Sequence, residues 1–423
     1  KNILKGSLRH VFMMLSFSYT SSCRNNGGVA NWWYFGDSCS INFNNLTPNV
    51  VNNSGLNGLL APQSISDKQG NLLFYGNPHV LYDQSHNPMQ NGSLTNLATN
   101  GGYGGQPYTL IIPKPCSPEI YYYFYCEISN VFANPWQWDL KYAEIDMSLN
   151  GGLGAVTVKD SLLRNDIYPT IDGSLHANNT HYWVVSRARN TNEYYSIEIT
   201  SNGVSTVPII SISGSSASVN TNVSDGQIRF SPDGNRIAHV LFNSPGVSPN
   251  NRLELFDFNK STGTLNFILD FSPPSGIGSI WFNNFQFAEF SPSGRFLYTR
   301  YSGSSPVYSI VQYDLQAGNN TAIANSGVLV PNTGSPNPAA FPRRSPEGKI
   351  FLSSGNSVFT QFHVMHNPDL PVPNCNFQPN AINVGRSVGV GLPSLINVAI
   401  ANHSITFSDS CATNTIDFSM VDT

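Results

Sequence analysis

The chain has few charged residues. Asp, Glu, Lys and Arg make up 11% of its 423 residues, against roughly a quarter of an average globular domain. The formal net charge is -4, and no basic stripe or run occurs, so we do not expect a nucleic-acid partner. Asn, Ser, Thr and Gly carry the surface polarity instead, a composition common among extracellular proteins.

Cysteine is also scarce. The six cysteines are too few for a scaffold built from disulfides, and none shows the C-x-x-C spacing of a zinc cluster. We therefore predict no metal site from them. Cys116 and Cys126 flank one short strand-like run and are the candidate disulfide; the alternative is that the cysteines are mostly buried thiols.

Long hydrophobic runs are missing, and nothing approaches the roughly 18 apolar residues of a membrane span. Near the N-terminus, Lys1, Lys5 and Arg9 precede the short apolar run "VFMMLSFSYTSS". A basic segment before an apolar one is typical of signal peptides. Residues 1–28 are thus expected to be signal-peptide-like or disordered, and the protein to be secreted or on the cell surface, without a membrane span.

One short pattern recurs along the chain. "SPDGNRIAHVLF" from Ser231 returns as "SPSGRFLYTRYS" from Ser291 and "SPEGKIFLSSG" from Ser345, and a looser copy, "SDKQGNLLFYG", starts at Ser66. The glycines of the first three lie 60 and 54 residues apart. Further degenerate copies fill the remaining gap, "CSPEIYYYFYCEIS" from Cys116 and "HANNTHYWVVSRA" from His176. Self-similarity at a fixed period indicates a repeat architecture.

Each repeat unit reads as two β-hairpins. The second half of a unit is an alternating strand pair broken by a Gly- or Asn-bearing turn, as in "LELFDFNKSTGTLNFI". Four-stranded sheets of this length bury their faces by stacking radially, which predicts an all-β fold, a β-propeller of four-stranded antiparallel blades. Residues 29–400 would form seven blades, with strands near 32–43 and 385–400 sharing one sheet; six blades are the alternative. Residues 401–423 would begin a further β-sandwich module or form a tail.

An ordered set of motifs carries a family resemblance. "WWYFG", "SISDKQGNLLFYGN", "YAEIDMSLNGGLG", "IRFSPDGNRIA", "EFSPSGRFLY" and "GLPSLIN" resemble, in this order, the WD-repeat-like propeller domains of bacterial gliding-motility-associated surface proteins. The resemblance spans about residues 31–400. It implies export by the type 9 secretion system, PKD-type modules after the propeller, and a binding role at the cell surface without a catalytic site to carry over.

Catalytic and metal-binding signatures are weak. No G-x-S-x-G elbow occurs. The run from Asp146 to Gly151 imitates the start of a calcium loop, but Thr157 stands where the loop needs Glu, so we interpret it as a hairpin turn. We interpret His79, His86, His176 and His181 as structural. Glu144, Asp146, Glu254 and Asp257 are the acidic residues that a glycoside-cleaving enzyme would draw on.

We therefore expect a non-catalytic binding module or adhesin segment with no cofactor, whose partner is a surface protein or a glycan. The alternatives are a polysaccharide hydrolase or lyase and a structural component of a surface layer or filament. The candidate ligand-binding residues are aromatic ones in two loops expected on the same face, of which we expect at least one Trp to be exposed. They are Phe132, Trp136, Trp138, Trp281 and Phe282.

Overall fold

The structure of the protein is a computed structural model. The residues that it describes are 28–45, 47–56, 62–94, 108–130, 133, 137–189, 191–214, 225–242, 251–274, 284–302, 308–331, 333, 339–354, 359–389, 391–394, 403–410 and 415–422. Residues 1–27, which carry the signal-peptide-like segment, lie outside them. Among the described residues, no helix has the length and apolarity needed to cross a membrane.

The first half of the chain forms a three-stranded and an eight-stranded sheet. The three-stranded sheet contains β1 (Trp32–Phe35), β2 (Cys39–Asn42) and β3 (Asn49–Val50). The eight-stranded sheet, of order β4-β5-β6-β7-β11-β10-β9-β8, contains β4 (Gln63–Ser66), β5 (Leu72–Gly76), β6 (Val80–Asp83), β7 (Pro88–Ser93), β8 (Thr109–Pro113), β9 (Ile120–Asn130), β10 (Gln137–Asp146) and β11 (Ala155–Arg164). Its two antiparallel halves meet at a single parallel pairing of Ala155 with Gln90.

Four more sheets follow in chain order. The first contains β12 (Asp172–Leu175), β13 (Tyr182–Arg187), β14 (Glu193–Thr200), β15 (Gly203–Val204) and β16 (Ile209–Ile212), where β15 and β16 both pair with β14. The others are β17 (Asp225–Phe230), β18 (Arg236–Phe242), β19 (Arg252–Asn259) and β20 (Thr264–Asp270); β21 (Asn284–Phe290), β22 (Phe296–Ser302), β23 (Tyr308–Asp314) and β24 (Val328–Leu329); and β25 (Ala339–Arg344), β26 (Ile350–Ser354), β27 (Gln361–Met365) and β28 (Phe377–Asn383).

Two short helical segments and a hairpin complete the described elements. They are the 3₁₀ turn η1 (Asn150–Gly152), the helix α1 (Asn320–Ala324), and the pair β29 (His403–Ser410) and β30 (Thr415–Asp422). The hairpin forms a sheet of its own. Residues 401–423 thus contain a hairpin, and a further module that begins here stays a prediction.

The recurring turn joins the first and second strands of its sheet, as the sequence predicts. The Gly234 N–H donates to the carbonyl of Ser231 at 2.9 Å, and the Ser231 hydroxyl accepts from the Arg236 N–H at 2.9 Å. All four turn glycines have φ between 72° and 86°, the left-handed region that favours glycine. The degenerate copies from Cys116 and His176 likewise lie between β8 and β9 and between β12 and β13.

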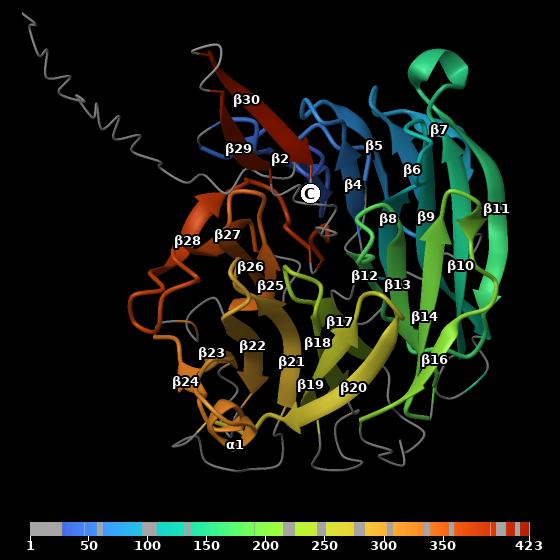
Figure 1. Ribbon diagram of the computed structural model, residues 1–423. Helices are drawn as coiled ribbons and strands as arrows, with labels where there is room; N and C mark the ends of the chain where they lie inside the picture. Colours follow the sequence, from blue (N-terminus) through green and yellow to red (C-terminus); the bar gives the residue numbers. More distant parts are fainter. Residues whose placement is uncertain are drawn as a thin grey trace, which may run out of the picture.

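The hydrophobic core lies between neighbouring sheets. Each described cluster joins one sheet, or one half of the eight-stranded sheet, to the next along the chain. A last cluster packs Trp33 and Phe35 of β1 against Phe351 and Phe362 of the β25–β28 sheet, and so closes the ring. The chain is therefore an all-β propeller, with five smaller sheets and the eight-stranded sheet arranged around a ring (Figure 1).

The predicted closing strand is wrong in the part of 385–400 that the structure describes. Residues 384–389 and 391–394 form no strand. They still contribute to closure, because the Asp37 N–H donates to the Ser387 carbonyl at 3.0 Å and Val388 and Leu392 enter the closing cluster.

Candidate functional site

Only one of the predicted aromatic binding residues lies in the described part of the chain. Trp138 is the second residue of β10, is half-buried, and stacks on Tyr108 with ring centroids 5.3 Å apart. It packs against the core cluster between β8–β11 and β12–β14. Phe132, Trp136, Trp281 and Phe282 lie outside the described residues, so their place on one face stays a prediction.

The candidate disulfide between Cys116 and Cys126 does not form. Both are free thiols, Cys116 exposed in the turn before β9 and Cys126 buried in that strand. Six residues of extended strand separate Cys126 from the start of β9, which is about 20 Å at the rise of a β-strand. A disulfide needs Cα atoms within about 7 Å, so a strand between two cysteines holds them apart.

The calcium-like run and the histidines make local contacts. The Asp146 carboxylate accepts from the Ser148 N–H at 2.9 Å and thus stabilises its own turn. His181 Nδ1 lies 2.8 Å from Glu198 Oε1, and the His176 ring stacks on Trp183. No group of three metal-ligating side chains occurs within the described ranges.

The four acidic residues weighed for glycoside cleavage belong to two separate sheets. Glu144 and Asp146 lie on β10, whereas Glu254 and Asp257 lie on β19. The β12–β16 sheet packs between these two sheets. The structure therefore does not bring the four carboxylates together.

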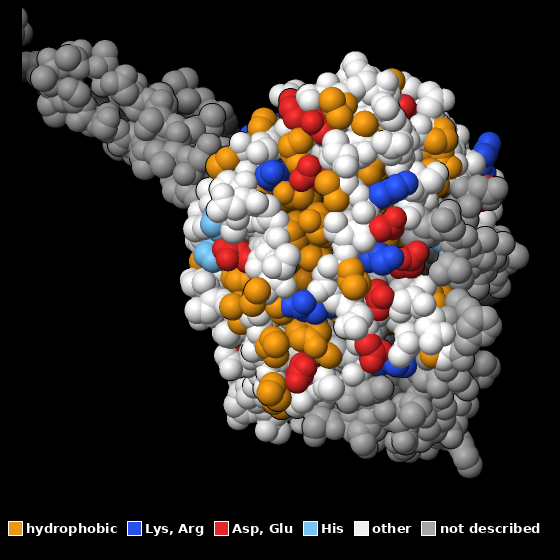
Figure 2. Space-filling view, turned by 90° about the vertical axis from the view of Figure 1, so that its right-hand side faces the viewer, with side chains coloured by type: hydrophobic (Ala, Val, Ile, Leu, Met, Phe, Trp, Pro, Cys, Tyr) orange, Lys and Arg blue, Asp and Glu red, His pale blue; other side chains and the backbone are white. Residues whose placement is uncertain are grey.

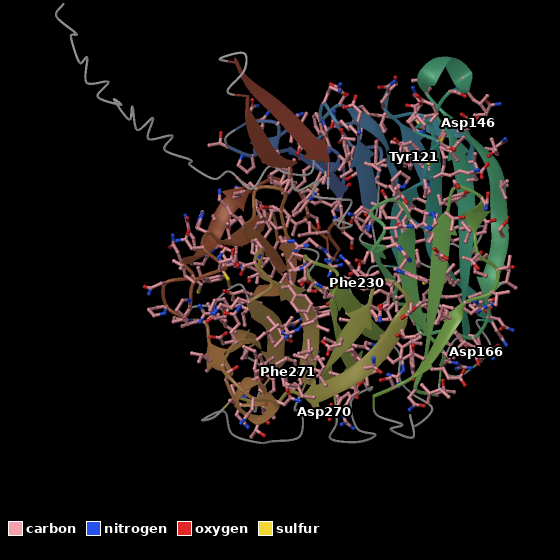
Figure 3. The ribbon with its side chains drawn as sticks, viewed as in Figure 1. Tyr121, Asp146, Asp166, Phe230, Asp270 and Phe271 are labelled. Atoms are coloured by element: carbon pink, nitrogen blue, oxygen red, sulfur yellow. The ribbon has the colours of Figure 1, made fainter. Side chains whose placement is uncertain are left out.

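A cluster of charges is buried where the first strands of several sheets meet; we call it the axial charge cluster. It consists of Asp172 on β12, Arg229 on β17, Glu289 on β21, and Arg343 and Arg344 on β25. First strands are the innermost strands of a propeller, and Figure 3 places Phe230, the residue after Arg229, toward the middle of the ring. Asp146, Asp166 and Asp270 lie further out (Figure 3).

Arg229 makes the closest ion pairs of the axial charge cluster, although its Nε has no hydrogen-bond partner among the described residues. Its Nη2 lies 2.7 Å from Glu289 Oε2, and its Nη1 lies 3.4 Å from Asp172 Oδ2. Arg229 Nη1 also donates to the Ser394 hydroxyl at 3.0 Å, while the Ser394 N–H donates to Gln63 Oε1 at 3.2 Å. The "GLPS" segment therefore reaches the axis and joins β4 to β17.

Arg343 is poorly satisfied by comparison. Its Nη1 lies 3.7 Å from Glu289 Oε2, beyond hydrogen-bond distance, on a carboxylate oxygen that Arg229 already contacts. Neither Nε nor Nη1 of Arg343 has a hydrogen-bond partner among the described residues. The Arg343 side chain is only 3% exposed, so bulk water does not supply the missing partners.

The pKa values in the axial charge cluster show which charges are poorly compensated. Burial, followed by the neighbouring Arg229, lowers the pKa of Arg343 to about 9. Burial opposes ionisation of Glu289, yet Arg229, Arg344 and Arg343 together hold the pKa of Glu289 below its usual value. Burial raises the pKa of Asp172 despite the contact with Arg229. Arg343 and Asp172 are thus the members whose charges are least compensated by their neighbours.

Sequence reasoning overlooked this cluster, although the repeat contains its signal. Arg229, Glu289 and Arg343 each stand two residues before the serine of the turn, in "RFSPDG", "EFSPSG" and "RRSPEG". Equivalent positions of a repeat lie at the same height around the ring. Charged residues recurring at one position of an otherwise apolar first strand could have been recognised as an axial group.

A second feature lies on the outside of the ring, over β11 and the segment that contains β16. Figure 2 shows hydrophobic side chains gathered in a long stripe on this face, bordered by acidic and basic ones. Arg164 Nη2, at the end of β11, donates to the Thr206 carbonyl at 3.2 Å and joins the two segments. We call the exposed aliphatic residues here the outer apolar stripe: Leu162 (57% exposed), Val207 (76%), Ile209 (41%), Ile210 (54%) and Ile212 (72%).

Comparisons with known proteins find only weak structural likenesses. No family model and no curated protein matches the chain. Among solved structures, a candidate 6-phosphogluconolactonase from Bacteroides uniformis is 10% identical, with a TM-score of 0.42 over 78% of this chain and 97% of that one. TolB from Acinetobacter baumannii is 13% identical, with a TM-score of 0.33 over 61% of this chain and 52% of that one. Hydrazine synthase from Kuenenia stuttgartiensis is 9% identical, with a TM-score of 0.41 over 85% and 92%. Likenesses of this strength concern the fold and carry no argument about function.

Proposed function

We propose that the protein is a non-catalytic, extracellular propeller that binds a partner protein along the outer apolar stripe. The observation that carries this proposal is the exposure of Val207, Ile210 and Ile212, each more than half exposed within six residues of chain. Soluble proteins rarely leave contiguous apolar side chains in water without a partner to cover them. The low charge of the chain makes such a stripe more adhesive than it would be on a highly charged surface.

A protein partner fits the stripe better than a glycan does. Its residues are aliphatic and offer neither aromatic faces on which sugar rings stack nor donors for hydroxyl groups. Trp138, the described member of the predicted aromatic set, is engaged with Tyr108. A glycan site built on Trp136 and Trp281 remains the alternative that the same binding experiment addresses.

The proposed location is the cell surface or the medium, and the proposed relatives are the gliding-motility-associated propellers that the motifs resemble. The scarcity of charged residues supports this location. Protease treatment of intact cells should degrade the protein; full protection until lysis would contradict it.

We also propose that the ring has seven blades. The two antiparallel halves of the eight-stranded sheet meet at one parallel pairing, and this supports counting each half as a blade beside the five smaller sheets.

The binding experiment compares substitutions on the stripe with the same change elsewhere. Ile210→Lys and Ile212→Lys place charge on the stripe, whereas Val328→Lys changes a 49% exposed residue of β24 on another sheet. All three side chains are exposed, so stability should change by less than about 0.5 kcal/mol. The variants are compared for binding to an envelope extract of the producing cells and for self-association by sedimentation.

Loss of binding by about tenfold in the two stripe variants, with Val328→Lys unchanged, is the expected result. Equal binding by all three variants and the parent would refute the stripe. Self-association abolished by the stripe variants, without any envelope partner, would favour the structural component of a surface layer instead.

A further inference from the structure

The turn between β19 and β20 contains a sequon for N-linked glycosylation. Asn259, Lys260 and Ser261 match the pattern Asn-x-Ser/Thr, in which the asparagine amide is the sugar acceptor. Of the Asn-x-Ser/Thr sequons in the chain, this one alone has an acidic residue, Asp257, two positions before the asparagine. Bacterial transferases that act on this sequon require an acid at that position. The recognition segment is therefore residues 257–261.

All three recognition side chains of this segment face water. Asp257 and Asn259 are exposed on β19, whereas Phe258 between them is buried in the cluster shared with the β12–β16 sheet. Successive side chains of a strand point to opposite faces, so the acid and the asparagine lie on the same side. Ser261 is exposed in the turn that follows. A sugar on Asn259 would therefore extend into solvent without displacing a core side chain.

The amide nitrogen of Asn259 is also free for attachment. Asn259 Oδ1 accepts from the N–H groups of Ser261 at 3.0 Å and Thr262 at 3.2 Å, which is the usual role of asparagine in a turn. Among the residues that the structure describes, neither Asn259 Nδ2 nor the Ser261 hydroxyl has a hydrogen-bond partner. The Asp257 carboxylate is 66% exposed and lies 4.0 Å from Arg236 Nε, a weak surface pair. The turn thus uses the amide oxygen and leaves the nitrogen available.

We propose that Asn259 carries an N-linked glycan, transferred from a lipid-linked pyrophosphoryl oligosaccharide. Nδ2 forms a bond with C1 of the first sugar, the bond from C1 to the pyrophosphate oxygen breaks, and the lipid pyrophosphate leaves. One Nδ2 proton passes to a base of the transferase. The Lys260 carbonyl accepts from Trp183 Nε1 at 2.8 Å and fixes the folded turn, so transfer takes place before the turn closes against β13. The inference rests on the proposed extracellular location, because such transfers follow export, but it does not depend on the outer apolar stripe.

Two other sequons differ in the state of their amide nitrogen. Asn52 Nδ2 donates to the Val384 carbonyl at 2.6 Å, and Asn91 Nδ2 donates to the Val156 carbonyl at 3.3 Å. Both nitrogens are engaged by the fold, and neither asparagine follows an acid at the second position. We expect both to be unmodified.

The test is mass spectrometry of peptides from the protein recovered from the surface or medium of the producing cells. The peptide that contains Asn259 should carry added mass and release sugar fragment ions. Asn259→Asp keeps the oxygen that closes the turn and loses the nitrogen, whereas Ser261→Ala keeps Asn259 and loses the hydroxyl. Both variants should lose the added mass, and so should Asp257→Asn. The matched control, Asn91→Asp, changes an exposed sequon and should keep the added mass on Asn259.

An unmodified Asn259 peptide, from protein that protease removes from intact cells, would overturn the glycan alone. Protection of the protein until lysis would overturn the glycan and the proposed location together. Added mass that persists in Ser261→Ala would refute an N-linked glycan, and added mass unchanged in Asp257→Asn would refute recognition of the acid.

Discussion

Two turn glycines at equivalent positions of the repeat allow the backbone cost and the steric cost of a Gly→Ala substitution to be measured separately. Gly234 and Gly294 occupy the same position of the repeat with φ of 72° and 73°. A Cβ added at Gly234 would lie 2.1 Å from Ser174 Oγ on β12, whereas at Gly294 its nearest neighbour would be Pro232 Cδ at 3.5 Å, an ordinary contact. Gly234→Ala and Gly294→Ala thus share the backbone penalty and differ in the steric one.

The expected magnitudes follow from this difference. An alanine in the left-handed region costs roughly 1–2 kcal/mol at either position. Overpacking a filled interior adds about 1–3 kcal/mol, and Ser174 is only 1% exposed, so it has little room to move. Gly294→Ala should therefore lower the free energy of unfolding by about 1–2 kcal/mol, and Gly234→Ala by about 2–5 kcal/mol.

The assay is a double-mutant cycle in guanidinium chloride. Ser174→Ala removes the clashing oxygen and leaves Ser174 Cβ 3.4 Å from the new methyl group. In that background the cost of Gly234→Ala should fall to that of Gly294→Ala, whereas a distant pair would be additive. Equal costs of the two single substitutions, or no rescue by Ser174→Ala, would refute the steric reasoning.

Two further perturbations test ring closure and acid sensitivity. Trp33 is fully buried and packs edge-on against Phe43 and Phe351, with ring centroids 5.0 and 5.4 Å away. Trp33→Ala should therefore lower the free energy of unfolding by about 3–5 kcal/mol, and Trp32→Ala, at the half-buried neighbour, should lower it distinctly less. Similar melting temperatures for the two variants would contradict closure through Trp33. Burial lowers the pKa of His363 to about 4, so the unfolded chain binds a proton more readily and stability should fall as pH drops below about 6.5, by roughly 1.4 kcal/mol per unit until about pH 4. His363→Asn should flatten this dependence in unfolding measured from pH 7 to 4, and an unchanged slope would exclude His363 as a source.

The sequence predicts the parts of the fold that local chemistry determines. A serine, a tight turn and a glycine between two strand-like runs specify the hairpin wherever they occur, and the repeat period then orders the sheets. Closure depends on contacts between distant residues, so it is harder to predict. The apolar side chains between residues 385 and 400 predict a strand. An apolar pattern indicates only that side chains are buried, however, and Val388 and Leu392 are buried in the closing cluster without forming a strand. Gly391 and Pro393 interrupt the run, and glycine and proline both weaken a β-ladder.

The candidate sites were only partly predictable, for a related reason. A tryptophan is equally suited to an exposed binding face and to a core, and Trp138 lies half-buried against a core cluster, stacked on Tyr108. The outer apolar stripe contains "VPIISI", whose residues resemble those of any buried strand. Their exposure follows from the place of β16 on the outside of its sheet, which composition does not encode.

The position of the axial charges within the repeat argues that they serve something other than the blade. In an alternating strand, Phe230 and Phe290 point into the clusters between sheets, so the preceding Arg229 and Glu289 face the opposite way. The equivalent residues of β4 and β12 are Ser64 and Ser174, and both strands form and pair without a charge there. Burying a charge is costly and apolar replacements are often as stable. Arg229 contacts Asp172 of β12, Glu289 of β21 and Ser394, so the arginine at this position serves contacts between sheets rather than the pairing of its own strand.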